Sequence, residues 1–379
     1  MRQLQMVDLK SQYEHIKSQV DKAIIDVVES SAYINGPEVH QFQKDLEDYL
    51  DVKHVIPCAN GTDALQIAMM GLGLKPGDEV ITVDFTFAAT VEVIGLLNLT
   101  PVLIDVEEDT FNMDIEALKK AITPKTKAIV PVHLFGQCAN MEEILKVAKE
   151  HNLFVIEDTA QAIGANYTFS NGETKKAGTI GDVGTTSFFP SKNLGCYGDG
   201  GAIFTNNDDL AHTIRGIVNH GMYKRYYHDV VGVNSRLDSI QAAILRIKLP
   251  LLDGYCDARR KAATYYNEAF ASNENIETPV VSDFTTHVFH QYTLKVKNVD
   301  RDALHQHLLE NKIPNAIYYP VPLHSQKAYA DERYNEDDFK VTNELVKTVI
   351  SLPMHTELDE EQLAFITKTI NDFVNNNSK

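Results

Sequence analysis

The chain has 379 residues, of which 44% are hydrophobic and 23% charged, a composition typical of a globular protein with two or three domains. Its 35 basic and 53 acidic residues give a formal net charge of −18, which repels phosphate at long range. This balance argues against nucleic-acid binding, and a phosphorylated ligand needs a local positive site.

Neither targeting nor metal binding is indicated. The N-terminal stretch lacks the apolar core of a secretory signal, and no apolar run reaches the ~18 residues that predict a membrane span. The four cysteines are spaced too widely for a disulfide framework or a zinc site. They are Cys58, Cys138, Cys196 and Cys256. We therefore expect a cytoplasmic protein with no bound metal and no membrane partner.

The first 250 residues predict strands that alternate with helices, after an amphipathic helical arm over residues 1–35. Short, often β-branched apolar runs predict buried parallel strands. These runs are His54–Cys58, Glu79–Val83, Pro101–Ile104, Ala128–Val132, Leu153–Ile156, Thr185–Phe189 and Ala202–Thr205. Helices are predicted between them at Ala64–Gly73, Met141–Glu150 and Asp208–Asn219. This alternation predicts an α/β fold in which helices cover both faces of a mostly parallel sheet.

Beyond residue 250 the pattern changes. Helices are predicted over Ala258–Ala271, Arg301–Asn311 and Asp359–Asn375, with a strand over Gln291–Val296. We expect a large domain over residues 1–250 and a smaller α+β domain over residues 251–379.

Lys192 lies in the segment SFFPSKNLGCYGDGG, between two phenylalanines and a series of glycines, and no carboxylate is nearer in sequence than Asp199. Desolvation lowers the pKa of a lysine, and a neutral amine attacks a carbonyl to form a Schiff base. A structural lysine among glycine turns is an equally good interpretation of this segment alone.

Two further features predict a ligand at the edge of the sheet. Asp158 ends an apolar run, and ligands of open α/β sheets bind beyond the carboxyl ends of the strands. A carboxylate there keeps a pyridine nitrogen protonated, although an N-cap role is an alternative. The turn Asn60-Gly61-Thr62-Asp63 precedes a helix and offers backbone N–H groups to phosphate, with plain capping by Thr62 or Asp63 as the alternative.

A phosphate turn, a strand-end carboxylate and an isolated lysine are together the parts that hold pyridoxal 5′-phosphate. The stretches CANGTDAL, EDTAQAIGA, SFFPSKNLGCYGDGGA and VGVNSRLDSIQAAIL resemble the DegT family of nucleotide-sugar aminotransferases. The resemblance covers nearly the whole chain. It implies a fold-type I transferase with pyridoxal 5′-phosphate as its cofactor.

The resemblance also implies the roles of individual residues. Lys192 binds the cofactor covalently and transfers the proton, Asp158 pairs with the pyridine nitrogen, and Asn234 reaches the cofactor of a neighbouring subunit. The full set implied for the cofactor is Gly61, Thr62, Phe87, Asp158, Gln161, Ser187, Lys192 and Asn234. The site is therefore expected at the interface of a homodimer.

The substrate implied by the resemblance is a UDP-linked 2-acetamido-2-deoxy-3-oxo-glucuronate, aminated at carbon 3, with L-glutamate as donor and 2-oxoglutarate as product. The resemblance further implies that the product is used in lipopolysaccharide or O-antigen synthesis. The substrate residues expected are Arg236, Tyr318, Tyr319 and His324, with Lys224 and Arg225 as further local cations. The Tyr318-Tyr319-Pro320 loop differs from the His-Tyr-Pro of the uronate enzymes, and packing between domains is an alternative role for both tyrosines.

Other functions remain open at this point. The acceptor is alternatively another 3-oxo or 4-oxo-6-deoxy sugar linked to UDP or dTDP, and a non-catalytic, cofactor-sensing regulator is an alternative class. A dinucleotide-dependent oxidoreductase is disfavoured because no GxGxxG fingerprint follows a strand. Among the histidines, His133 is expected in the core, and His287 and His290 are expected at the surface or as caps.

Overall fold

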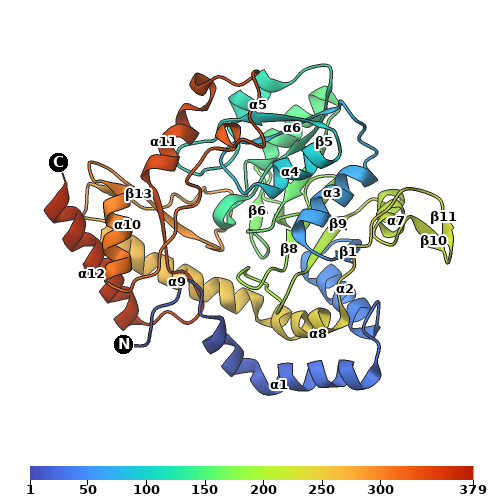
Figure 1. Cartoon of the computed structure of the whole chain (residues 1–379), viewed down its shortest axis with the longest axis horizontal. Coiled ribbons are helices and arrows are strands. Elements are labelled where there is room, and N and C mark those ends of the chain that lie inside the picture. Colours follow the sequence, from blue (N-terminus) through green and yellow to red (C-terminus); the bar gives the residue numbers. More distant parts are fainter. Residues whose placement is uncertain (379) are drawn as a thin grey trace.

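The computed structural model describes residues 1–378. A seven-stranded sheet forms its centre (Figure 1). The strand order is β1 (His54–Cys58), β9 (Gly201–Thr205), β8 (Val183–Ser187), β5 (Phe154–Asp158), β4 (Thr126–Val130), β2 (Glu79–Val83) and β3 (Thr100–Ile104). Only β9 runs against the other strands of this sheet, because both of its pairings are antiparallel. The mostly parallel sheet predicted from the sequence is confirmed.

Alternation along the strands gives the sheet two apolar faces. Val55 and Phe204 point into one core, whereas their neighbours Ile56 and Ile203 point into the other. The first face is covered by α2 (Pro37–Leu50), α5 (Ile115–Ala121), α6 (Met141–His151) and α8 (Ser239–Lys248). The second face is covered by α3 (Gly61–Gly71), α4 (Ala89–Leu96) and α7 (Asp208–Ile217). Burial on both faces explains why the strands are apolar runs rather than alternating ones.

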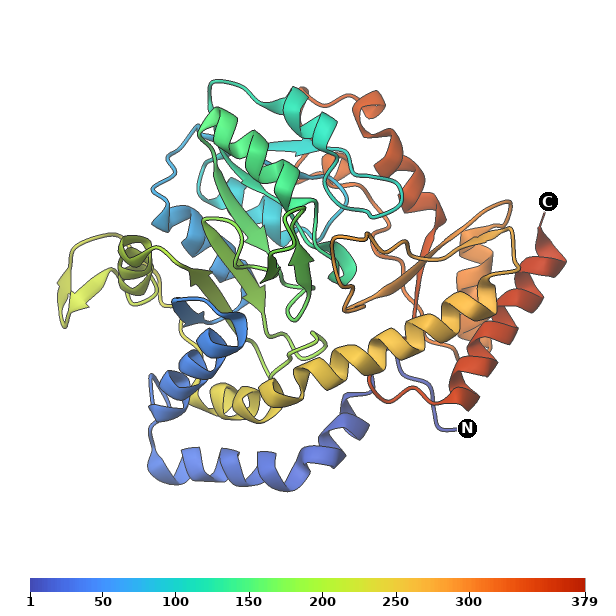
Figure 2. The ribbon, with the colours of Figure 1, turned by 180° about the vertical axis from the view of Figure 1, so that it is seen from behind.

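A smaller three-stranded antiparallel sheet lies in the C-terminal part. Its order is β12 (Ile276–Glu277), β13 (Tyr292–Val296) and β14 (Val349–Leu352). It packs with α10 (Arg301–Glu310), α12 (Glu360–Asn377) and the distal half of α9 (Leu252–Phe270). The long helix α9 joins the two parts, since Leu252 belongs to the main core and Phe270 to the small one (Figure 2). Helix α11 (Lys340–Thr348) packs back toward the main core through Leu345.

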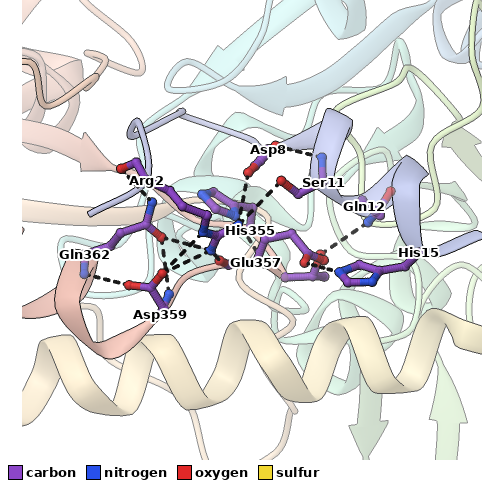
Figure 3. A network of polar contacts seen from close by, with 10 residues as sticks. Arg2, Asp8, Ser11, Gln12, His15, His355, Glu357, Asp359 and Gln362 are labelled. Atoms are coloured by element: carbon purple, nitrogen blue, oxygen red, sulfur yellow. Dashed lines mark hydrogen bonds and ion pairs between the residues drawn. The ribbon is translucent and has the colours of Figure 1, made fainter.

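The N-terminal segment connects both parts of the molecule. Helix α1 (Leu9–Ser30) lies along α8, while Leu4 is buried in the small core. A guanidinium nitrogen of Arg2 lies 3.2 Å from a carboxylate oxygen of Asp359, and Nε2 of His15 lies 2.9 Å from a carboxylate oxygen of Glu357 (Figure 3). The segment predicted as an N-terminal arm, residues 1–35, therefore also contacts the C-terminal part of the chain.

Two short hairpins complete the large domain. The first hairpin consists of β6 (Asn166–Thr168) and β7 (Thr174–Lys176). The second consists of β10 (Met222–Lys224) and β11 (Tyr227–His228). The β10–β11 hairpin projects away from the body in both views (Figures 1 and 2). Among the helices of residues 1–378, none is both long enough and apolar enough to cross a bilayer.

One histidine that the sequence placed in the core lies there. His133 is fully buried, its Nδ1 accepts from the Ala139 N–H (3.1 Å), and its Nε2 lies 3.0 Å from Glu157. It is a satisfied core histidine, as predicted. All four cysteines are buried and free.

Candidate active site

A cavity of about 690 Å³ lies at the carboxyl edge of the large sheet, where β5 and β8 end and where α3 and α4 begin. This is the edge at which open α/β sheets bind ligands. Most of the residues predicted for the site line this cavity. These are Gly61, Thr62, Phe87, Asp158, Gln161, Ser187, Lys192, Tyr318 and Tyr319.

The turn before α3 is shaped for an anion. Asn60 caps the helix by accepting from the Asp63 N–H at 2.8 Å, so the alternative of capping by Thr62 or Asp63 is wrong. A Cβ on Gly61 would lie 2.7 Å from Cβ of Ser187, a distance that real side chains do not tolerate. Glycine therefore lets the helix start approach the end of β8. The free N–H groups of a first helical turn attract phosphate there.

Asp158 is a fixed carboxylate at the end of β5, 6% exposed. Its Oδ2 accepts from the Thr90 hydroxyl (2.9 Å), and its Oδ1 accepts from the Ala160 N–H (3.1 Å). Residues 160–164 form turns and no helix follows Asp158 directly, so the interpretation of Asp158 as a helix N-cap is wrong. The contacts hold the carboxylate in the cavity wall.

Lys192 lies in the loop between β8 and β9. Within residues 1–378 its amine makes no hydrogen bond or ion pair. Desolvation lowers the pKa of Lys192 to about 8, and the negative charge of Asp158 opposes this shift. The loop is fixed by Asn193, whose Nδ2 donates to the Val288 carbonyl (2.9 Å), and by Lys248, whose Nζ donates to the Gly195 carbonyl (2.6 Å). The lowered pKa gives Lys192 a larger neutral fraction than an ordinary lysine has, and the neutral amine is the form that attacks a carbonyl.

Another wall of the cavity contains residues from both parts of the chain, Gln161 from the large domain and Tyr319 from the C-terminal part. Gln161 accepts from the Phe135 N–H (2.7 Å) and donates to the Tyr319 hydroxyl (3.1 Å). The Tyr319 ring also packs against Phe85 and Phe87, with centroids 5.9 and 6.4 Å apart. Tyr319 thus both packs between domains and faces the cavity.

These residues fit pyridoxal 5′-phosphate. The Gly61 turn suits its phosphate, Asp158 suits its ring nitrogen, and Lys192 suits its aldehyde. When bound, this cofactor supplies an electron sink for bond breaking at the carbon that carries the amine. The fold and the site therefore define a fold-type I pyridoxal-phosphate enzyme.

Comparison with known proteins gives the family. The model of the DegT/DnrJ/EryC1/StrS aminotransferase family matches residues 14–371, and the chain belongs to this family. It is 45% identical over 363 residues to the UDP-2-acetamido-2-deoxy-3-oxo-D-glucuronate aminotransferase of Pseudomonas aeruginosa, covering 96% of this chain and 98% of the relative. It is 46% identical over 370 residues to a "Pleiotropic regulatory protein" of Geobacillus stearothermophilus, covering 97% and 98%.

A solved structure agrees with this assignment. The structure of NtdA from Bacillus subtilis with bound cofactor PMP superposes with a TM-score of 0.87 at 30% identity, covering 94% of this chain and 82% of that one. The chain is thus a sugar aminotransferase that uses pyridoxal 5′-phosphate.

Five predicted residues do not line the cavity, and two of them, Lys224 and Arg225, lie on the β10–β11 hairpin. Asn234 is exposed and pairs with Asn219 through a β-bridge, and Arg236 is half-buried on the same segment. His324 is buried, with Nδ1 2.7 Å from Asp84 and Nε2 3.3 Å from Glu336. Each ring nitrogen of His324 faces a carboxylate. Within this chain, His324 therefore holds the loop after Tyr319 against the end of β2.

The sequence interpretation missed one wall of the cavity. His290 and Gln291 line it, although they precede β13 in the small domain. The expectation that His287 and His290 lie at the surface is wrong, because each is only 4% exposed. The sequence signal that could have identified these two residues is a polar pair that directly precedes the apolar strand β13.

Proposed function

We propose that the protein transfers an amino group from L-glutamate to carbon 3 of a UDP-linked 2-acetamido-2-deoxy-3-oxo-glucuronate. The 45% identity to the Pseudomonas aeruginosa enzyme named for this substrate, over nearly the full length of both chains, carries the proposal. We further propose that the reaction takes place in the cytoplasm and supplies diamino sugars for lipopolysaccharide O-antigen. Four free, buried cysteines suit a reducing compartment.

Lys192 is proposed to bind the cofactor and then to carry the proton that moves at the substrate carbon. Its lowered pKa suits both roles, because the amine must lose a proton before it attacks and accept one afterwards. Asp158 is proposed to hold the proton on the ring nitrogen. Gly61, Thr62 and Ser187 are proposed to bind the phosphate.

A homodimer is proposed because the cavity of one chain lacks cations. Asp63, Glu92, Asp158 and Asp199 line it, whereas Lys192 is the only lysine or arginine among the described lining residues. The cofactor phosphate, glutamate and a UDP-sugar are all anions, so further positive charge must come from elsewhere.

The projecting hairpin is the proposed source of that charge. Lys224 and Arg225 lie on it with exposed side chains, and Asn234 and Arg236 follow it in the chain. We propose that these residues enter the cavity of a second copy, where Arg236 contacts a carboxylate or phosphate and Asn234 the cofactor phosphate. Tyr318, Tyr319 and, through its loop, His324 are proposed to shape the sugar pocket.

The substrate is tested by running the reaction in reverse. A panel of UDP- and dTDP-linked 3-amino and 4-amino sugars is incubated with holoenzyme and 2-oxoglutarate, and glutamate formation is measured. We expect the 3-amino uronate to react best. A 4-amino-6-deoxy sugar that reacts while the 3-amino uronate stays inert would show that the acceptor is a different nucleotide sugar.

One relative is named for regulation and not for catalysis. The Geobacillus stearothermophilus relative is called a "Pleiotropic regulatory protein". A regulatory role would add to the aminotransferase activity of the family and would not replace it. Glutamate added to purified holoenzyme tests the activity directly, since an aminotransferase converts the bound cofactor to its amine form.

A further inference from the structure

Asp158 is a buried carboxylate that accepts hydrogen bonds from neutral groups only. The Thr90 hydroxyl donates to its Oδ2 (2.9 Å), and the Ala160 N–H donates to its Oδ1 (3.1 Å). The residue is 6% exposed, and within residues 1–378 its carboxylate forms no ion pair. Buried charges in proteins are normally paired with an opposite charge. The two donors therefore fix the direction of the carboxylate without neutralising it, which leaves its charge for a cation in the cavity.

Thr90 reaches Asp158 from a different element of the fold. It lies in the first turn of α4, is 1% exposed and lines the cavity together with Asp158. Helix α4 begins after Ala88 without a side-chain cap. The hydroxyl bond thus connects the start of α4 to the end of β5, although 68 positions separate the two residues in the chain.

Other helical threonines of this chain use their hydroxyls differently. Those of Thr213, Thr264 and Thr348 donate to the backbone carbonyl four residues earlier, a bond that stays within one helix. The hydroxyl of Thr90 instead donates to a carboxylate of another element. Without this hydroxyl, the buried Asp158 would keep a single donor, and removing a donor from a buried charged group is costly.

The segment directly before α4 carries a second residue expected to hold the cofactor. Phe87 precedes Thr90 by three residues, lines the cavity and is 59% exposed. An aromatic side chain there suits the face of a pyridine ring, whereas Asp158 suits the nitrogen at the edge of that ring. The Thr90 bond therefore sets the position of the carboxylate relative to the segment that carries the aromatic ring.

We propose that Thr90 is a positioning residue that aims Asp158 at the ring nitrogen of the cofactor and leaves the carboxylate its full charge. A cationic donor at this place would compensate the charge that has to hold the ring proton, whereas a hydroxyl does not. The inference rests on the proposed pairing of Asp158 with the ring nitrogen and is independent of the sugar and of the amino donor.

The test compares Thr90→Val, which has the same shape without the hydroxyl, with Thr90→Ser, which keeps the hydroxyl. Pyridoxamine 5′-phosphate is titrated into the cofactor-free protein, and its dissociation constant is measured by calorimetry. This amine form makes no covalent bond to Lys192, so its affinity reports the other contacts. We expect Thr90→Val to bind it about 10-fold more weakly, near the lower end for a hydrogen bond to a charged group.

A modified cofactor shows whether the effect passes through the ring nitrogen. In 1-deazapyridoxamine 5′-phosphate, a C–H group replaces this nitrogen and gives Asp158 no partner. We expect Thr90→Val to bind this analogue within about twofold of the wild-type protein, because the contact that Thr90 supports is absent from both complexes. The preference for the natural cofactor over the analogue should therefore fall about 10-fold in Thr90→Val.

The control variants separate this role from a general effect on packing. Thr90→Ser should keep the wild-type preference within about threefold, since its hydroxyl is still available to Asp158. Thr90→Ala lacks both the hydroxyl and the bulk, and it should lose the preference as Thr90→Val does. Thr82→Val removes a buried hydroxyl that donates to the Val130 carbonyl (2.9 Å) and does not line the cavity, so the preference should stay unchanged.

Two results would overturn the inference: an unchanged affinity of Thr90→Val for pyridoxamine 5′-phosphate, or an equal loss for this cofactor and its analogue. Failure of the proposed pairing is recognisable in the wild-type protein alone. If wild type binds the cofactor and the analogue equally well, Asp158 does not pair with the ring nitrogen, and the inference about Thr90 is wrong with it.

Discussion

Lys192 and Lys248 show why a lowered pKa alone does not identify a reactive lysine. Burial lowers the pKa of both to about 8. Lys248, however, donates to the Gly195 carbonyl at 2.6 Å and does not line the cavity, whereas Lys192 lines it without a partner in the described chain. Location and free hydrogen-bonding capacity therefore distinguish the two amines.

This contrast predicts the result of borohydride reduction. Reduction of the holoenzyme should fix the cofactor on the peptide that contains Lys192, as read by mass spectrometry. Lys248→Met should still be labelled at Lys192, and Lys192→Ala should not be labelled. A label on Lys248 or on a surface lysine would contradict the assignment.

At the residue scale, the sequence predicted those site residues whose positions follow from their immediate neighbours in the chain. Lys192, Asp158 and Gly61 each stand beside a strand end or a helix start, and such positions follow from apolar patterning. His290 was placed wrongly because it comes from the other domain. Its approach to Lys192 depends on tertiary contacts such as that of Asn193 with Val288, which no local pattern encodes.

At the element scale, the approach of α3 to β8 is set by one glycine. Gly61→Ala would place a methyl group against Ser187. Overpacking of this kind costs about 1–3 kcal/mol, which corresponds to about 5- to 150-fold in an equilibrium constant. We expect the dissociation constant of pyridoxal 5′-phosphate to rise by a factor in this range, measured by titrating cofactor-free protein and following the absorbance.

Gly95→Ala is the matched control. Gly95 lies in α4, and a Cβ there meets no atom within 4 Å in the described structure. Cofactor affinity should stay at the wild-type level in this variant. Normal affinity in Gly61→Ala would instead show that the phosphate does not bind between α3 and β8.

The start of α12 provides a second prediction at this scale. The Asp359 side chain accepts from the Gln362 N–H (2.9 Å), and the side-chain oxygen of Gln362 accepts from the Asp359 N–H (3.3 Å). The hydrogen bond from Gln362 and the charge of Arg2 lower the pKa of Asp359. A depressed carboxyl pKa adds stability above the unfolded pKa, and this stability is lost as pH falls through the folded pKa.

We therefore expect Asp359→Ala to lower the free energy of unfolding by about 1 kcal/mol at neutral pH, the usual cost of losing a cap. Asp359→Asn keeps the acceptor and should cost less. The difference between wild type and Asp359→Asn should shrink as the pH is lowered through the carboxyl range, measured by chemical denaturation. A difference that stays constant with pH would exclude a contribution from the carboxylate charge.

At the scale of the whole molecule, the sequence predicted the layered α/β architecture but not how its parts are joined. Most predicted strands and helices of the large domain agree with the structure to within a few residues, because burial on both sheet faces gives unbroken apolar runs. The link made by the N-terminal segment was not predictable. Arg2 pairs with Asp359, more than three hundred positions away (Figure 3), and Leu4 joins the core of the small domain, through contacts that only the folded chain creates.

The proposed dimer leads to a test that needs the complete assembly. If each site combines Lys192 of one chain with Asn234 of the other, the variants Lys192→Ala and Asn234→Ala are each impaired as homodimers. In a mixed dimer, one site receives both intact residues and the other receives neither.

Random reassortment makes about half of the dimers mixed, so activity should recover to about a quarter of the wild-type value. Chains are mixed under mild denaturant, refolded with cofactor and assayed, and differently tagged copies verify that mixed dimers form. If mixed dimers form without recovery, each site is built from one chain, and the cations that the cavity lacks must come from within that chain.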